Sequence, residues 1–242
     1  MLKWGFVLSL CLGVAAMAGA DLVQYHAQRN SGNLAALSNF SAPAWTQAPS
    51  LPFRYAALET PTLIEGGNVK FLWNEEYLFV FADMIDSDIV QEADKDGEHF
   101  YRSGDVLEIF IRPAGAACYW ELYVAPNGHL TTFFYPSRGR LLPSCFNEPA
   151  MPGYQAKIEL DGTFNNYADR DHGWRCIAAI PMKSLAEKAG ALDFRKPWLV
   201  QVARYNYSVY LDQTEYSQIG ITTTKTPNYH EFKSWINLFL EP

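Results

Sequence analysis

Residues 105–135, DVLEIFIRPAGAACYWELYVAPNGHLTTFFY, contain three short runs of apolar and aromatic residues separated by turn residues. Within each run apolar and polar side chains alternate, which is typical of half-buried β-strands. In the first run, Leu107 and two isoleucines share one face, whereas Glu108 shares the other face with Phe110. The stretch therefore predicts a β-sandwich or barrel with an apolar core face and a second face that carries polar groups.

The rest of the chain extends this pattern. Further strands are predicted at 69–73 and 77–84, which form a hairpin, and at 154–160, 174–180, 198–211 and 235–240. Residues 181–190 are the one good helix signal, because Pro181 suits the first helical position and Gly190 suits the end. Residues 21–60 are predicted to be an extended segment that joins a sheet edge or crosses the sandwich. We therefore expect an all-β domain with one short helix.

The first twenty residues predict a targeting segment. Lys3 supplies a positive charge, residues 6–14 are apolar, and Ala18-Gly19-Ala20 is a small-residue cleavage pattern. The apolar run is too short to span a bilayer, and the alternative is a buried N-terminal helix. We expect a signal peptide (1–20) that is cleaved after Ala20, and a secreted or periplasmic single domain (21–242) without a membrane span.

Composition restricts the partners. The net charge is −7, which is a poor match for nucleic acids or anionic membranes and suits a neutral ligand or a cation. Aromatic residues make up 15% of the chain, and tyrosine and tryptophan are favoured both in sandwich cores and on sugar-stacking surfaces. No nucleophile motif or zinc-ligand spacing is present, so neither chemistry is predicted.

Three cysteines follow the predicted cleavage site: Cys118, Cys145 and Cys176. Because an exported protein permits disulfides and the number is odd, at most one bridge forms within the chain. Cys118 and Cys145 are the favoured pair, since Cys118 opens a predicted strand and Cys145 lies in the loop after the next strand. The alternative is three buried thiols that act as small apolar residues.

An acidic loop follows the predicted hairpin. Asp86, Asp88, Asp94 and Asp96 place several carboxylates on one loop, and carboxylate oxygens are the ligands that calcium prefers. The sequence therefore suggests a structural calcium site and no required cofactor. A solvated acidic loop explains the same pattern without a metal and is the favoured interpretation.

Charged residues also occur on the predicted strands. Glu108 and Glu121 could meet across neighbouring strands, either as hydrogen-bonding groups or as the carboxylate pair of a glycoside hydrolase. Arg204 falls on the apolar face of its strand, where a buried guanidinium needs an acidic partner. An internal ion pair and ligand binding are both open for Arg204.

Aromatic residues in predicted loops are the candidates for stacking against a sugar ring. They are Phe100, Tyr101, Trp174 and Tyr229. A sugar presents apolar C–H faces to such rings, while its hydroxyl groups need carboxylate, amide or guanidinium partners. Core packing is the alternative role for each ring.

Five segments together resemble family 9 carbohydrate-binding modules. They are WNEEYLFVF (73–81), GDVLEIFI (104–111), YWELYVAPNG (119–128), WLVQVARYN (198–206) and WINLFL (235–240). Their order and spacing extend over most of residues 55–240. The resemblance implies an immunoglobulin-like antiparallel β-sandwich that binds sugars without cleaving them and serves carbohydrate catabolism, in some cases beside a partner glycoside hydrolase.

The resemblance also implies site residues. It places the strand carboxylate of the family at Glu108, one clamping ring at Phe100 or Tyr101, and the second at Tyr229. Members of the family clamp the sugar between two tryptophans and carry structural calcium. This chain has no tryptophan at either clamp position, and Glu121 stands where an arginine is expected.

The resulting hypothesis is an exported, non-catalytic sugar-binding protein that uses Glu108, Glu121 and Arg204 beside the rings. Three alternatives stay open. One is a b-type haem protein in which Met84 and one histidine (His129, His172 or His230) are axial ligands. The others are a glycoside hydrolase that uses the two glutamates and a surface protein with a degenerate site.

Overall fold

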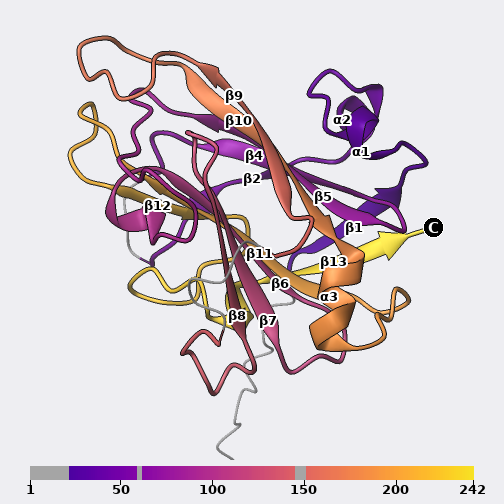
Figure 1. Ribbon diagram of the computed structural model, residues 1–242. Helices are drawn as coiled ribbons and strands as arrows, with labels where there is room; N and C mark the ends of the chain where they lie inside the picture. The colour runs from indigo at the N-terminus through magenta and orange to yellow at the C-terminus, as the bar shows by residue number, and fades with distance from the viewer. Residues whose placement is uncertain (1–21, 59–61, 145–150) are drawn as a thin grey trace, which may run out of the picture.

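The computed structural model describes residues 22–58, 62–144 and 151–242, which are built mainly from β-strands (Figure 1). The all-β prediction is therefore confirmed. The strands are β1 (Gln24–Arg29), β2 (Leu51–Pro52), β3 (Arg54–Tyr55), β4 (Gly67–Trp73), β5 (Tyr77–Ile85), β6 (Val106–Arg112), β7 (Tyr119–Val124), β8 (Leu130–Tyr135), β9 (Gln155–Asp161), β10 (Gly173–Pro181), β11 (Trp198–Asn206), β12 (Glu215–Gln218) and β13 (Ile236–Glu241). The short helices are α1 (Leu34–Leu37), α2 (Pro43–Gln47), α3 (Met182–Ala189) and the 3₁₀ turns η1 (Phe100–Arg102) and η2 (Phe232–Ser234).

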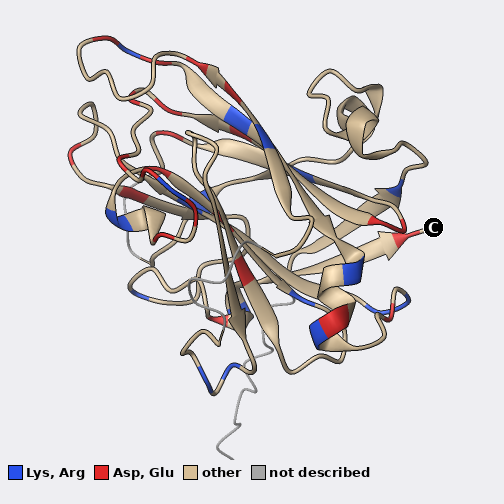
Figure 2. Ribbon diagram, in the orientation of Figure 1, with Lys and Arg blue, Asp and Glu red and all other residues tan. Residues whose placement is uncertain are grey.

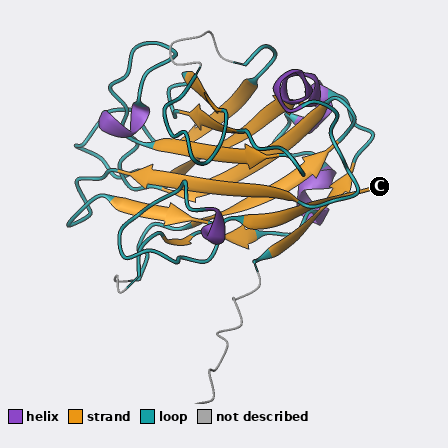
Figure 3. Ribbon diagram, turned by 90° about the horizontal axis from the view of Figure 1, so that it is seen from below, coloured by secondary structure: helices purple, strands orange, loops and turns teal. Residues whose placement is uncertain are grey.

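Hydrogen bonds join the main strands into one sheet in the order β8-β7-β6-β11-β13-β1-β4-β5-β10-β9. The sheet folds over, so that the half made of β8, β7, β6 and β11 faces the half made of β4, β5, β10 and β9 (Figures 1 and 3). Strand β1 connects the halves, because it pairs in parallel with β13 along most of its length and with β4 at its end. An immunoglobulin-like arrangement of purely antiparallel sheets is therefore not confirmed.

The main core fills the space between the two halves. Leu107, Ile109 and Ile111 of β6 lie in it, as their alternation predicts, and Trp198 of β11 and Trp174 of β10 are buried with them. Full burial of one large apolar side chain contributes roughly 1.5–3 kcal/mol. This core therefore fixes which face of each strand points outward.

Two further apolar clusters cover the outer faces of the folded sheet. On one side, Leu37 and Trp45 of α1 and α2 pack against Phe79, Phe81 and Ile177 of β5 and β10, and both helices lie beside these strands in Figure 1. On the other side, the segments at 99–101 and 229–235 pack over β6, β7 and β11. The second cover is the part of the fold that positions the site.

The predicted elements agree with the structure at most boundaries. Helix α3 is confirmed, whereas α1 and α2 are additional, so the expectation of a single helix is wrong. The strand predicted at 198–211 ends at Asn206. Within the segment predicted at 21–60, β1 does not join a sheet edge, because it is inserted between β13 and β4. Helices α1 and α2 of the same segment lie across the outer face of β5 and β10.

Two of the three cysteines that follow the predicted cleavage site lie in the described residues. Cys118 and Cys176 are buried free thiols, and Cys145 lies outside the described residues, as does the predicted signal peptide. Lysine, arginine and the acidic residues occur mostly in loops and near strand ends (Figure 2). None of the helices in residues 22–58, 62–144 and 151–242 has the length and apolar character that crossing a bilayer requires.

Candidate functional site

A pocket of about 260 Å³ opens on the outer face of β6, β7, β8 and β11. The strands form its floor, and the segments at 99–101 and 227–230 form its walls. Its lining residues are His99, Tyr101, Glu108, Phe110, Glu121, Tyr123, Phe133, Tyr135, Tyr205, Pro227, Asn228, Tyr229 and His230. We call this the Glu108 pocket.

Strand register brings the floor residues together. Glu108 of β6 pairs with Tyr123 of β7, and Phe110 pairs with Glu121, so the two glutamates are diagonal neighbours on one face. Tyr205 of β11 lies on the same face, two residues beyond the partner of Glu108. The prediction that Glu108 and Glu121 could meet across neighbouring strands is confirmed.

Glu108 is a buried carboxyl group with an unused oxygen. Only 2% of the residue is exposed, and its Oε1 atom has no hydrogen-bond partner among the described residues. Burial, and then the charge of Glu121, raise the pKa of Glu108 well above its ordinary value, although the Tyr123 hydroxyl opposes the shift. Burial therefore favours the protonated form of this carboxyl, and in that form it can donate a hydrogen bond into the pocket.

Glu121 has a more polar environment. Its Oε1 accepts a hydrogen bond from the Tyr123 hydroxyl at 2.7 Å, and its Oε2 accepts one from the Tyr135 hydroxyl at 2.6 Å. Burial raises the pKa of Glu121 from 4.5 to about 7, and these two hydrogen bonds limit the rise. Near neutral pH the two neighbouring carboxyls therefore carry at least one proton between them.

His230 stands at the wall beside Glu121. Its Nδ1 lies 2.9 Å from the Tyr119 hydroxyl, and its Nε2 lies 3.7 Å from Oε2 of Glu121. Burial, and then the charge of Arg138, lower the pKa of His230 to about 4. The imidazole is therefore neutral at pH 7 and adds no positive charge to the pocket.

Aromatic rings surround the two carboxyls. The ring centroid of Tyr205 lies 5.3 Å from that of Tyr101 and 5.5 Å from that of Tyr229. The centroid of Phe110 lies 6.3 Å from that of Tyr229. Tyr101 and Tyr205 are partly exposed, whereas Tyr229 and Phe110 are buried. The two partly exposed rings are the ones a ligand can reach first.

Of the residues singled out from the sequence, Glu108, Glu121, Tyr101 and Tyr229 line one pocket. Phe100 does not line it, because its ring is fully buried and packs 6.0 Å from the ring of Tyr123. Phe100 therefore supports the pocket from behind.

Trp174 and Arg204 lie elsewhere, which corrects their assignment to the ligand site. Trp174 is the second residue of β10, not a loop residue, and it is buried in the main core. Arg204 lies on the core side of β11, opposite to Tyr205. Its Nη2 donates to Oδ2 of Asp86 at 2.8 Å, so the internal ion pair is the correct alternative, with Asp86 as the acidic partner.

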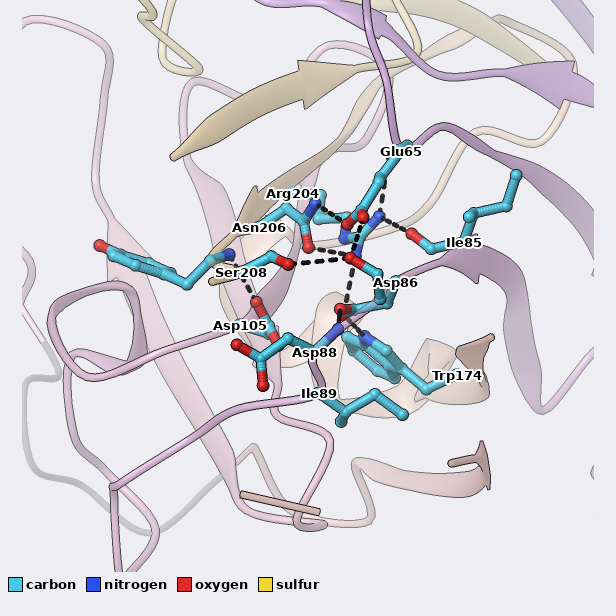
Figure 4. Close-up of polar contacts among 12 residues, drawn as sticks. Glu65, Ile85, Asp86, Asp88, Ile89, Asp105, Trp174, Arg204, Asn206 and Ser208 are labelled. Carbon is cyan, nitrogen blue, oxygen red and sulfur yellow. Dashed lines mark hydrogen bonds and ion pairs between the residues drawn. The ribbon is translucent and has the colours of Figure 1, made fainter. Parts of the chain in front are cut away.

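The guanidinium of Arg204 is the centre of a buried polar network (Figure 4). Its Nη1 donates to the backbone carbonyls of Ile85 at 2.7 Å and Glu65 at 3.2 Å, and its Nη2 also donates to Oδ1 of Asn206. Trp174 donates from Nε1 to Oδ2 of Asp86 at 3.1 Å. These contacts connect the end of β5 to β11 by hydrogen bonds and an ion pair.

Three of the four acidic residues proposed for calcium have polar partners in the structure. Asp86 binds Arg204, and Oδ2 of Asp88 accepts a hydrogen bond from the backbone of Val209 at 2.9 Å. Asp96 pairs with His129 at 3.1 Å, and Asp94 lies in the loop just before it. Across the described ranges no group of three or more His, Cys, Asp or Glu side chains is placed to hold a metal ion. Calcium binding stays a prediction.

The residues named for haem ligation are dispersed. Met84 is buried in the main core, whereas the side chain of His172 is 80% exposed and lies 3.5 Å from Asp161. His129 pairs with Asp96 on the surface, and only His230 lines the Glu108 pocket. This arrangement offers no observation in favour of the haem alternative.

Several pocket residues were missed from the sequence. Tyr123, Tyr135 and Tyr205 lie on strands, where aromatic residues were assigned to core packing by default. The available signal was the strand face that they share with the glutamates. Period-two alternation puts Tyr123 on the same face of its strand as Glu121, and therefore beside a carboxyl group. His99 and His230 lie in loops, and nothing local in the sequence indicated their position.

Comparison with known proteins reveals the fold. A candidate carbohydrate-binding protein from Bacteroides uniformis superposes with a TM-score of 0.66 and 11% identity, over 91% of this chain and all of that one. Family 9 carbohydrate-binding modules from Caldicellulosiruptor kristjanssonii also superpose. The chain has the fold of family 9 carbohydrate-binding modules.

The two Caldicellulosiruptor structures contain cellotriose and glucose, respectively. Each has a TM-score of 0.57 and 12% identity and covers 90% of this chain, with 95% and 97% of the module covered in turn. No family model and no curated protein matches the sequence. Identities this low establish a shared fold and carry no residue roles.

Proposed function

We propose that this chain is an exported, non-catalytic carbohydrate-binding protein and that its ligand occupies the Glu108 pocket. The observation that carries the proposal is the unpartnered Oε1 of Glu108, which is buried in a pocket lined with aromatic rings. A buried polar atom without a partner costs free energy unless a ligand satisfies it. The sugar-binding proteins that share the fold support the same class of ligand.

The pocket chemistry suits one sugar ring. Tyr101 and Tyr205 offer ring faces for the apolar C–H surface of a sugar. Of the Glu108 and Glu121 carboxyls, the one that holds a proton can donate to a hydroxyl oxygen, and the other can accept from a hydroxyl hydrogen. The volume of about 260 Å³ lies just below the ~300–1,000 Å³ of typical small-molecule sites, so the ligand is small and weak binding is expected.

Export and partnership belong to the same proposal. The signal-peptide pattern of residues 1–20 supports a secreted or periplasmic location. A non-catalytic binding protein would hold a sugar for another component, and a glycoside hydrolase is the partner class that the family resemblance suggests. Chemical turnover is not part of the proposal, because the sugar-bound structures that share the fold are binding modules.

The first test measures binding by titration calorimetry against a panel that includes glucose and cellotriose. In Tyr101→Ala the affinity should fall roughly tenfold, about 1.4 kcal/mol, because the ligand loses one stacking face. The matched control is Tyr167→Ala, since Tyr167 is 76% exposed and does not line the pocket. The control should bind like the unmodified protein.

Two results would count against the proposal. If no member of the panel binds, the pocket is not a sugar site. If Tyr101→Ala and the control bind equally well, the sugar sits elsewhere on the protein. Turnover of chromogenic glycosides that is abolished in Glu108→Gln would instead support the hydrolase alternative.

A further inference from the structure

We infer that the sugar held in the Glu108 pocket is an amino sugar with a free ammonium group. The inference rests on the proposed function and narrows its ligand class. It depends on three features of the pocket: two adjacent carboxyls, a set of close-packed aromatic rings and a described lining without lysine or arginine. Each feature favours a cation over a neutral hydroxyl compound.

The lining has an acidic character that a neutral sugar does not require. Glu108 and Glu121 are both buried, and none of the described residues that line the pocket is a lysine or an arginine. Two like charges placed together in a buried site repel each other unless a proton or a cation intervenes. An ammonium group would satisfy the unpartnered Oε1 of Glu108 with a charge-assisted hydrogen bond, which is stronger than a neutral one.

The rings form the second part of a cation site. Tyr101, Tyr205 and Tyr229 pack with successive centroid distances of 5.3 Å and 5.5 Å, and Phe110 adjoins Tyr229. Aromatic faces attract ammonium groups, with contributions of about 0.5–2 kcal/mol that grow when the cation is desolvated. Rings gathered around two carboxyls therefore select a positively charged group over a hydroxyl group.

The remainder of the lining favours a sugar over a simple amine. Asn228 in the wall brings an amide with both donor and acceptor atoms, and the partly exposed Tyr205 brings a hydroxyl group. A polyol ring that carries one ammonium would use both the charged floor and these neutral groups.

Protons should leave the pocket when an ammonium enters. Burial raises the pKa of both carboxyls, that of Glu121 to about 7, so near pH 6 the pair holds a proton that an ammonium beside it would replace. A neutral sugar would displace none. The titratable and charged groups that face this pair are Tyr123, Tyr135, Tyr205, Tyr229, Tyr101, His99 and His230, with Arg102 near His99 and Arg138 near His230.

The test compares glucosamine, glucose and N-acetylglucosamine by calorimetry at about pH 6, below the ordinary pKa of an amine. We expect glucosamine to bind about tenfold more tightly than the two neutral sugars. Repetition in two buffers of different ionisation enthalpy should reveal release of about one proton with glucosamine only. In Glu108→Gln the preference should shrink to about twofold or less.

The outcomes separate this inference from the proposed function. Equal binding of glucose and glucosamine, without proton release, overturns the amino-sugar inference and leaves sugar binding intact. Failure of all three sugars removes the proposed function itself. Binding of tetramethylammonium as tight as that of glucosamine also overturns the inference, because the pocket would then select an ammonium without a sugar. The proton release is measured on the unmodified protein and does not depend on the folding of a variant.

Discussion

Replacement of Arg204 by methionine is expected to lower the free energy of unfolding by about 3–5 kcal/mol. The guanidinium is fully buried, and it binds Asp86, Asn206 and two backbone carbonyls. Methionine would fill much of the volume but would leave these acceptors without a donor. The carboxyl of Asp86 would then be buried without its cation, which is the costly part of the change.

The measurement is urea unfolding at neutral pH, with Arg175→Met as the matched control. Arg175 pairs with Glu159 at 2.6 Å on the surface, where both side chains are substantially exposed. Exposed ion pairs contribute about 0–1 kcal/mol, so the control should lose less than about 1 kcal/mol. Similar losses in the two variants would show that the buried pair does not stabilise the fold.

A double variant separates charge burial from packing. Asp86→Asn added to Arg204→Met removes the unpaired carboxylate and keeps an acceptor for Trp174, whose indole nitrogen binds Oδ2 of Asp86 at 3.1 Å. The double variant should therefore be more stable than Arg204→Met alone. If it is less stable, lost packing and not an uncompensated charge explains the destabilisation.

The parts of this structure that depend on local alternation were predictable from the sequence. Leu107 faces the core and Glu108 faces outward because neighbouring residues of a strand point to opposite faces. The short loop at 113–118 between β6 and β7, with Gly115 at positive φ, then makes these two strands antiparallel neighbours. For this reason the approach of Glu108 to Glu121 could be predicted without a tertiary structure.

The parts that depend on how distant segments stack were not predictable. The need of Arg204 for an acidic partner followed from burial, but Asp86 lies 118 positions away along the chain and is brought near by the folding over of the sheet. The same folding places Trp174 in the core. His230 reaches Glu121 through a loop whose path no periodicity encodes. The insertion of β1 between the halves could not be predicted for a similar reason, because its two partner strands, β4 and β13, lie far apart in the sequence.

Stability should also depend on pH through Glu121, and the Glu121→Gln variant is expected to remove that dependence. Burial raises the pKa of this carboxyl from 4.5 to about 7 in the folded protein. Between these two values the folded state keeps a proton that the unfolded state has lost. Stability therefore falls as pH rises through this window, by about 3 kcal/mol for the full shift. Below the window both states are protonated and no penalty applies.

The measurement is the free energy of unfolding of the unmodified protein and of Glu121→Gln from about pH 4.5 to pH 8. Glutamine resembles the protonated carboxyl and can still hydrogen-bond to Tyr123 and Tyr135, so the two proteins should be similarly stable at the acidic end. By pH 8 the glutamine variant should be the more stable one by about 3 kcal/mol. A constant difference across the range would show that Glu121 has an ordinary pKa.

Tyr135→Phe provides the control for the direction of the shift. Its hydroxyl donates to Oε2 of Glu121 at 2.6 Å and holds the pKa of that carboxyl down. Without this hydrogen bond the pKa of Glu121 should rise further, and the loss of stability should extend to higher pH. A shift of the window toward lower pH would contradict the assigned role of the Tyr135 hydroxyl. The same carboxyl pair supplies the proton that an ammonium ligand would displace. Ligand binding can therefore release a proton only at a pH at which the folded protein still holds that proton, that is, below the raised pKa of Glu121.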